Sequence, residues 1–239
     1  MNRSDQQAYD RGTSLYSPDG RIYQVEYARE AVKRGAPSLG IRASDGVVLA
    51  AQSRAGSDLM VAESIEKLHK IDDHVGAASA GHVADARKLV DFAREHAQVN
   101  RLRYGEPVGI EALTKEITDH IQENTQTGGT RPYGASLLLG GVDETGARLF
   151  ATDPSGTPQE WRAVAIGGGR DGIQEVLEER YDETAGVNDA VSLAVRALKT
   201  EVEDIEAEGM SLAAVTEEGY DPYTTEEISD LLDGVDVDE

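Results

Sequence analysis

Apolar residues along the chain alternate between blocks with helical spacing and blocks with strand spacing. The first block follows a turn at residues 17–20, carries two apolar stripes at helical intervals, and predicts a helix that stops at Gly35. Two apolar runs then flank an Asp-Gly dipeptide, a strong hairpin signal, at residues 38–43 and 47–52. The chain is therefore predicted to open with a helix and to continue as antiparallel strands.

The remaining blocks predict pairs of helices between groups of hairpin-linked strands. Strands are expected at residues 71–79, 135–142, 148–152, 159–166 and, as the last one, 210–215. Helices are expected from residue 83 to about 101–105, from about 110 to the glycines at 128–129, and near 170–181, 188–208 and 225–232. This order differs from the strict alternation of a parallel sheet. We predict one α+β domain over residues 1–239, with antiparallel sheets between helix layers.

The charge is strongly negative and unevenly distributed. The net charge of −22 would repel nucleic-acid phosphates and anionic membranes, so neither is an expected partner. Residues 200–239 form an acidic region with 15 acidic and no basic side chains, and only 6 of the 23 basic residues are lysine. The sparse lysine favours a halophilic protein, for which salt screens the self-repulsion. An ordinary protein with an acidic tail is the alternative.

The lack of certain residues excludes several chemistries. No cysteine is present, so disulfides, thiolate metal sites and cysteine nucleophiles are ruled out. The five histidines have no metal-ligand spacing, and we expect neither a metal nor a cofactor. The first seven residues are polar, and no apolar run approaches the ~18–20 residues of a membrane span. We therefore expect a soluble, cytoplasmic protein without a signal peptide.

Short motifs occur in a fixed order along nearly the whole chain. They are Tyr-Asp-Arg at 9–11, Tyr-Ser-Pro-Asp-Gly-Arg at 16–21, Gln-Val-Glu-Tyr-Ala at 24–28, Ser-Ile-Glu-Lys at 64–67, Val-Ala-Asp-Ala-Arg at 83–87, Gly-Gly-Thr-Arg-Pro-Tyr-Gly at 128–134, Arg-Leu-Phe at 148–150 and Asp-Pro-Ser-Gly at 153–156. Together they resemble archaeal proteasome α subunits, and the composition points to the haloarchaeal ones. The resemblance implies a four-layer αββα sandwich of the N-terminal-nucleophile hydrolase type, which agrees with the predicted element order.

The resemblance also implies a gate at the N-terminus. Residues 1–12 would be a mobile arm that covers the axial pore of a seven-membered ring of α subunits. The cluster that holds the arms open would contain Tyr9, Asp10, Pro18 and Tyr27. The axial pore loop would contain Thr127, Gly128, Gly129 and Thr130, with Thr127 where Tyr is more usual. Without the resemblance, the tyrosines and the turn would be read only as the packed start of a helix.

A docking pocket for activators is implied as well. It would receive the C-terminal carboxylate of a regulatory AAA ATPase and would contain Lys67, Gly35, His82 and Arg29. His82 departs from the apolar residue more usual there. An ammonium in a crevice suits a carboxylate, although a lone lysine is ordinarily a solvated surface charge. The other implied partners are proteasome β subunits and unfolded protein substrates.

Catalysis by this chain is not expected. The sister β subunits use an N-terminal Thr whose own α-amine serves as the base. Here the predicted first strand begins Gly35-Ala36-Pro37-Ser38, and cleavage after Gly35 would expose Ala36, which has no nucleophile. The function predicted is a non-catalytic subunit that gates and docks within a threonine protease particle.

Two other functions remain open on the sequence. One is a self-processing N-terminal-nucleophile amidohydrolase on the same fold. The other is an acidic nucleotide-binding protein that uses the glycine-rich segment 167–172, although this segment fits neither common phosphate-loop pattern and is more typical of a tight strand-to-helix turn.

Overall fold

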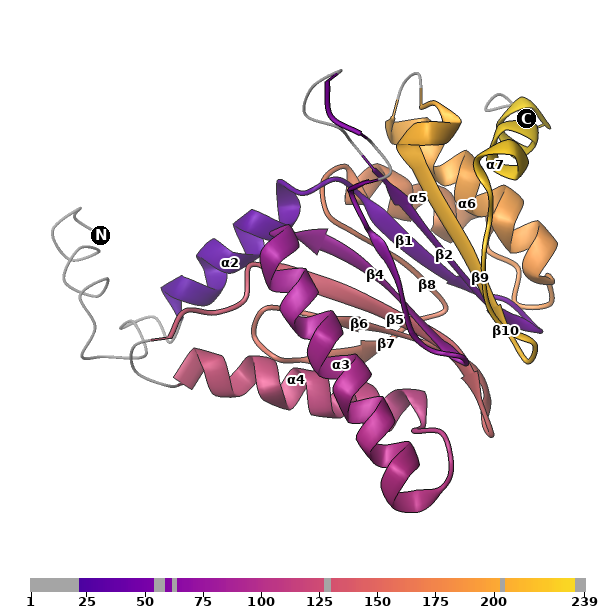
Figure 1. Cartoon of the computed structure of the whole chain (residues 1–239). Coiled ribbons are helices and arrows are strands. Elements are labelled where there is room, and N and C mark those ends of the chain that lie inside the picture. Colours follow the sequence, from indigo (N-terminus) through magenta and orange to yellow (C-terminus); the bar gives the residue numbers. More distant parts are fainter. Residues whose placement is uncertain (1–21, 54–58, 62–63, 127–129, 203–204, 235–239) are drawn as a thin grey trace, which may run out of the picture.

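Two antiparallel sheets of five strands each form the centre of the molecule. The computed structural model describes residues 22–53, 59–61, 64–126, 130–202 and 205–234. One sheet has the strand order β10-β9-β2-β1-β8 and the other has the order β3-β4-β5-β6-β7. Helices α3 and α4 cover the second sheet, whereas α5 and α6 cover the first (Figure 1). The predicted antiparallel sandwich between helix layers is confirmed.

The elements have the following bounds. The first sheet contains β1 (Ser38–Arg42), β2 (Gly46–Gln52), β8 (Ala163–Ile166), β9 (Met210–Thr216) and β10 (Gly219–Pro222). The second contains β3 (Leu68–Asp72), β4 (Val75–Gly81), β5 (Ala135–Asp143), β6 (Gly146–Thr152) and β7 (Pro158–Glu160). The helices are α2 (Tyr23–Lys33), α3 (Val83–Tyr104), α4 (Ile110–Gln126), α5 (Arg170–Arg180), α6 (Val187–Glu201), the short η2 (Ala207–Gly209) and α7 (Thr225–Gly234).

The sheets pack closely because small residues face large ones across the interior. A Cβ on Gly40 would lie 2.7 Å from Cδ1 of Leu149, and one on Gly140 would lie 2.6 Å from Cγ1 of Val47. Every residue of β2 except its last is buried, as expected for a strand covered on both faces. Separate apolar layers lie under α3 and α4 and under α5 and α6. The interior between the sheets is thus filled by side chains.

Local signals predicted the hairpins and caps well. The Asp-Gly dipeptide joins β1 to β2, which pair from Arg42 and Val47 outward. Gly105 ends α3 in the left-handed conformation, at the position where the sequence indicates a stop. Thr224 and Glu227 form the expected capping box at the start of α7, with the Thr224 N–H donating to Glu227 Oε2 over 2.7 Å.

Two predicted strands are wrong. The run at 71–79 is the hairpin of β3 and β4, which turns at Asp73 and His74 without a glycine or proline to signal it. The run at 159–166 is two strands, and Trp161 and Arg162 carry the chain from the second sheet to the first. An apolar run shows burial, but it does not show which sheet buries it.

The C-terminal part also differs from the prediction. Helix α6 ends at Glu201 rather than near residue 208, and η2 follows it. The strand at 210–216 is not the last one, because the short β10 pairs with its edge. All four residues of β10 are partly or fully exposed, and such a strand gives no apolar signal.

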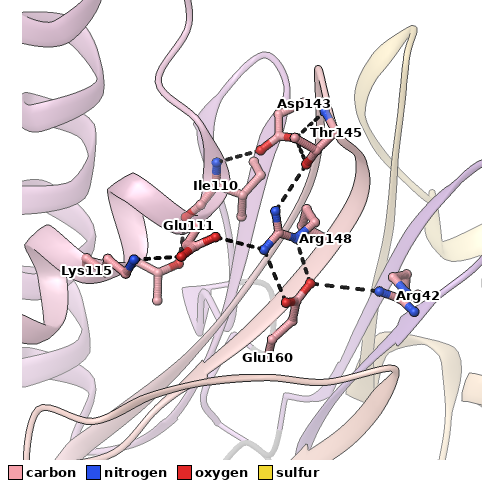
Figure 2. A network of polar contacts seen from close by, with 9 residues as sticks. Arg42, Ile110, Glu111, Lys115, Asp143, Thr145, Arg148 and Glu160 are labelled. Atoms are coloured by element: carbon pink, nitrogen blue, oxygen red, sulfur yellow. Dashed lines mark hydrogen bonds and ion pairs between the residues drawn. The ribbon is translucent and has the colours of Figure 1, made fainter.

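A polar network fastens the helix layer to the second sheet (Figure 2). Arg148 on β6 donates to Glu160 on β7 over 2.6 Å and to Glu111 on α4 over 3.0 Å. Asp143 accepts the N–H of Ile110 over 3.0 Å at the first turn of α4. The 148–150 motif therefore has a structural role, since its arginine joins α4 to two strands.

Candidate functional site

Helix α2 lies at one end of the sandwich and contacts β4 and β5 (Figure 1). Three small apolar side chains, Val25, Ala28 and Val32, attach its inner face. On its outer face the residue Tyr27 is 44% exposed, which is unusual for a large aromatic residue. The helix is thus held mainly by a narrow apolar seam and presents Tyr27 outward.

The link from α2 to β1 is held from several sides. A Cβ on Gly35 would collide with the backbone nitrogen of Gly81, so only glycine fits there. The carbonyl of Gly35 accepts the N–H of Gly168 over 2.7 Å. The carbonyl of Ala36 accepts from the Lys67 ammonium over 3.0 Å. The backbone runs through this point as an ordinary peptide.

Lys67 is a buried cation without a carboxylate partner among the described residues. Lys67 is 6% exposed, and among the described residues its Nζ donates to the carbonyl of Ala36. Burial lowers the pKa of Lys67 to about 8. A buried charge is normally paired, because leaving water costs several kcal/mol. The site at Lys67 therefore has the chemistry of an incomplete ion pair.

A cavity of about 250 Å³ lies beside Lys67. Tyr220, Met210 and Glu66 are among its lining residues. Burial, followed by the nearby Glu66, raises the pKa of Tyr220 to about 12, so its hydroxyl stays protonated. The cavity has the volume for a few ligand atoms next to the ammonium.

A second hollow of about 400 Å³ lies between α2 and the start of α3, and its lining includes Tyr27 and His82. Asp85 at its edge is buried and accepts from Arg131 over 2.6 Å and from the N–H of Gly134 over 2.8 Å. Burial would raise the pKa of Asp85, but these hydrogen bonds outweigh it and hold the pKa below its ordinary value. The 83–87 and 128–134 motifs are thus joined through Asp85 and Arg131.

Arg29 projects from the middle of α2 toward the turn after β6. Its Nε and Nη2 donate to the two oxygens of Asp153 over 2.9 and 3.1 Å. Its Nη1 donates to Glu26 over 2.6 Å. The hydrogen bonds that Arg29 donates to Asp153 raise the pKa of its guanidinium above the ordinary value. The ion pair of Arg29 and Asp153 therefore links the helix that contains the 24–28 motif to the 153–156 motif.

The structure brings some of the predicted docking residues together. Lys67 and Gly35 meet at the Ala36 peptide, and Gly35 touches Gly81, the neighbour of His82 in sequence. Arg29 lines a different hollow, on the side of α2 that faces Asp153. The signal for the missed partners Asp85, Arg131 and Asp153 was their place inside the ordered motifs.

Much of the predicted gate lies outside the described residues. This holds for the arm at 1–12, for Tyr9, Asp10 and Pro18, and for Thr127, Gly128 and Gly129 of the pore loop. The remaining residue of that loop, Thr130, donates from its hydroxyl to the carbonyl of Asn124 at the end of α4 over 2.8 Å.

The glycine-rich segment 167–172 forms the turn from β8 into α5. The carboxylate of Glu201 from α6 occupies the space beside Gly169 and Gly172. An anionic phosphate there would meet a carboxylate already in position, which opposes the nucleotide-binding hypothesis. Over the described ranges, no group of three or more potential metal ligands occurs, and no helix is long and apolar enough to cross a membrane.

Comparison with known proteins gives a consistent result. The proteasome subunit family matches residues 32–215, and the N-terminal signature of A-type proteasome subunits matches residues 9–31. The proteasome alpha 2 subunit of Haloferax volcanii is 66% identical over 232 residues, which are 97% of this chain and 93% of that protein.

Two further relatives agree with this match. The proteasome alpha subunit of Haloquadratum walsbyi is 58% identical over 96% of this chain and 93% of its own length. The proteasome alpha 1 subunit of Haloarcula marismortui is 56% identical over 100% of this chain and 96% of its own length. These relatives are haloarchaeal, in agreement with the acidic, lysine-poor composition.

Proposed function

The chain belongs to the proteasome subunit family and is of the α type. From this premise we propose that it controls the entry of substrates and binds a regulatory partner, without cutting peptide bonds itself. It would act in the cytoplasm, in a seven-membered α ring stacked on catalytic β rings. A regulatory AAA ATPase would dock on the ring, and unfolded proteins would enter through it.

The observation that supports the docking role is the charge of Lys67, for which the described residues provide no carboxylate partner. A carboxylate placed in the adjacent cavity would complete the ion pair and offset the burial of the ammonium. The free C-terminus of a partner protein supplies a carboxylate on a narrow, flexible chain end, which suits a cavity of about 250 Å³. Of the four predicted docking residues, only Lys67 lines this cavity, because His82 lines the separate hollow between α2 and α3 and Gly35 precedes the Ala36 carbonyl that Lys67 contacts.

The proposal of no catalysis is supported by what stands at the start of β1. Lys67 faces the carbonyl of the Ala36 peptide, where a catalytic relative would need a free amine on a hydroxyl residue. The nearest hydroxyl in sequence, that of Ser38, is fully buried and donates to the carbonyl of Ser79 over 2.8 Å. This geometry disfavours the self-processing amidohydrolase, for which the mature chain would have to begin at Ser or Thr.

The proposed gate combines the arm at 1–12 with a cluster of Tyr9, Asp10, Pro18 and Tyr27. Its support within the described residues is the outward position of Tyr27 on α2. An exposed phenol ring can stack on an arriving segment and offer its hydroxyl to it. Residues 127–130 would form the rim of the pore that the arms cover.

Deletion of residues 2–12 tests the gate. In particles reconstituted with β subunits, we expect the variant to degrade an unfolded protein several-fold faster, because the pore is no longer covered. Turnover of a tripeptide should change much less, since small substrates pass more easily. Substitution of the same residues by a Gly-Ser segment of equal length separates arm length from arm sequence. Equal rates for wild type and deletion with the unfolded protein would refute the gating role.

A further inference from the structure

Arg29 has little capacity left for a docking carboxylate. Three of its nitrogens donate to two carboxylates, those of Asp153 and Glu26, at 2.6 to 3.1 Å. One positive charge therefore already faces two negative ones. A third carboxylate brought to this guanidinium would meet net repulsion rather than attraction. Lys67, in contrast, has no carboxylate partner among the described residues.

Asp153 is itself built into the fold. The N–H of Ser155 donates to its Oδ1 over 2.7 Å, and the hydroxyl of Ser155 donates to the same oxygen. Burial would raise the pKa of Asp153, but the hydrogen bonds from Arg29 and Ser155 outweigh it and keep the carboxylate ionised. The 153–156 turn is thus a preformed receptor for one guanidinium, in the bidentate geometry that fixes its direction.

The pair also connects α2 to a turn that lies far from it in the sequence. Arg29 and Asp153 are 124 residues apart in sequence. The side chains of Val25, Ala28 and Val32 are buried, but they form no directional bonds. The bidentate ion pair in the middle of the helix adds a direction, because it fixes the Arg29 guanidinium relative to the Asp153 carboxylate. Tyr27 lies on the same helix, two residues before Arg29, so the position of α2 also sets the position of Tyr27.

We propose that Arg29 and Asp153 form the joint that sets the position of α2 for gating, and that Arg29 does not bind the docking carboxylate. Arg29 is then a positioning residue that acts through Tyr27 and the Gly35–Ala36 link. The inference rests on the proposed function. It assigns the binding of the carboxylate to Lys67, and the effect of that binding on the gate to Arg29 and Asp153.

The test uses Arg29→Gln, Asp153→Asn and the double variant in particles reconstituted with β subunits. Docking is measured as the affinity of a peptide with a free C-terminal carboxylate for the ring. Transmission is measured as the stimulation of unfolded-protein turnover by the same peptide at saturation. We expect both single variants to bind the peptide within about twofold of wild type and to lose most of the stimulation. The double variant should lose no more than either single one, because both substitutions break one joint.

Direct binding by Arg29 gives the opposite pattern. Arg29→Gln would then weaken docking about tenfold or more, the loss of a charge-assisted hydrogen bond, whereas Asp153→Asn would leave docking intact or tighten it. That result overturns the inference, and so does full stimulation in both single variants. Asp153→Asn keeps the side-chain volume and an acceptor for Ser155 but removes the charge and the second oxygen that the bidentate pair with Arg29 needs, so it provides the test by itself if Arg29→Gln does not assemble.

A control on the same helix separates the joint from a general effect of charge. Lys33→Gln removes an exposed ion pair with Glu30 that stays within α2, and it should keep docking and stimulation unchanged. A wild-type particle that neither binds the peptide nor responds to it refutes the proposed function itself. Binding and stimulation in the wild type with unaltered variants refute only the joint.

Discussion

Replacing Lys67 by Met is expected to make the protein more stable at pH 7 while abolishing docking. A fall in pKa from the ordinary 10.5 to about 8 corresponds to about 3 kcal/mol for keeping the buried ammonium charged. Methionine fills a similar volume without a charge but loses the hydrogen bond to Ala36, so we expect a net gain of about 1–3 kcal/mol. Denaturant unfolding at constant high salt measures it.

The pH dependence has a definite sign. Between pH 8 and 10.5 the unfolded chain binds more protons at Lys67 than the folded chain, so wild-type stability from this group rises with pH. The advantage of the Met variant should therefore shrink from pH 7 to pH 10. Lys70→Met is the control, since this exposed lysine pairs with Asp73 and should change stability by less than about 0.5 kcal/mol. A Lys67→Met variant less stable than wild type at pH 7 would contradict the unpaired-charge interpretation.

Asp85→Ala is expected to cause a large loss of stability. The substitution removes a buried carboxylate that holds Arg131 and the N–H of Gly134, and leaves that N–H without an acceptor. Because the Arg131 side chain is 66% exposed and can be hydrated, most of the loss comes from the buried groups. We expect about 2–4 kcal/mol, measured as a shift of the unfolding midpoint.

The acid dependence of this interaction follows from the lowered pKa of Asp85. The folded carboxyl holds its proton less tightly than the unfolded one, so the stabilisation is present above the ordinary pKa of 3.8 and is lost as the pH falls through the lowered value. Asp91→Ala on the same helix is the matched control, because its side chain is 64% exposed and only 3.8 Å from Arg94. Equal effects of the two substitutions would show that the Asp85 joint contributes nothing beyond a surface charge.

The sequence predicted those parts of the fold that depend on local signals. The Asp-Gly turn, the glycine after α3 and the Thr224 capping box each act within a few residues, and they were predicted correctly. The turn between β3 and β4 contains Asp73 and His74, which indicate the end of a strand less strongly than glycine or proline would. Strands β7 and β8 were merged because apolar spacing does not reveal a change of sheet.

The candidate site depended on contacts between distant residues, which spacing does not encode. A lone lysine is usually solvated, yet Lys67 is buried against the Ala36 carbonyl. The resemblance pointed to Lys67 and Arg29 alike, but the partners Ala36 and Asp153 emerged only from the fold, and they separate the two cations by their electrostatic surroundings. Among the described residues, Lys67 has no carboxylate partner, whereas Arg29 has two.

The most direct test of the docking role compares one peptide in two forms, with a free C-terminal carboxylate and with a C-terminal amide, titrated onto assembled rings of wild type and Lys67→Met. We expect the carboxylate form to bind the wild type at least about tenfold more tightly than the amide, as one charge-assisted pair requires, and the difference to vanish in the Met variant. Equal affinities of the two forms for the wild type, or a preference that survives in the Met variant, would contradict the assignment of Lys67 as the carboxylate receptor.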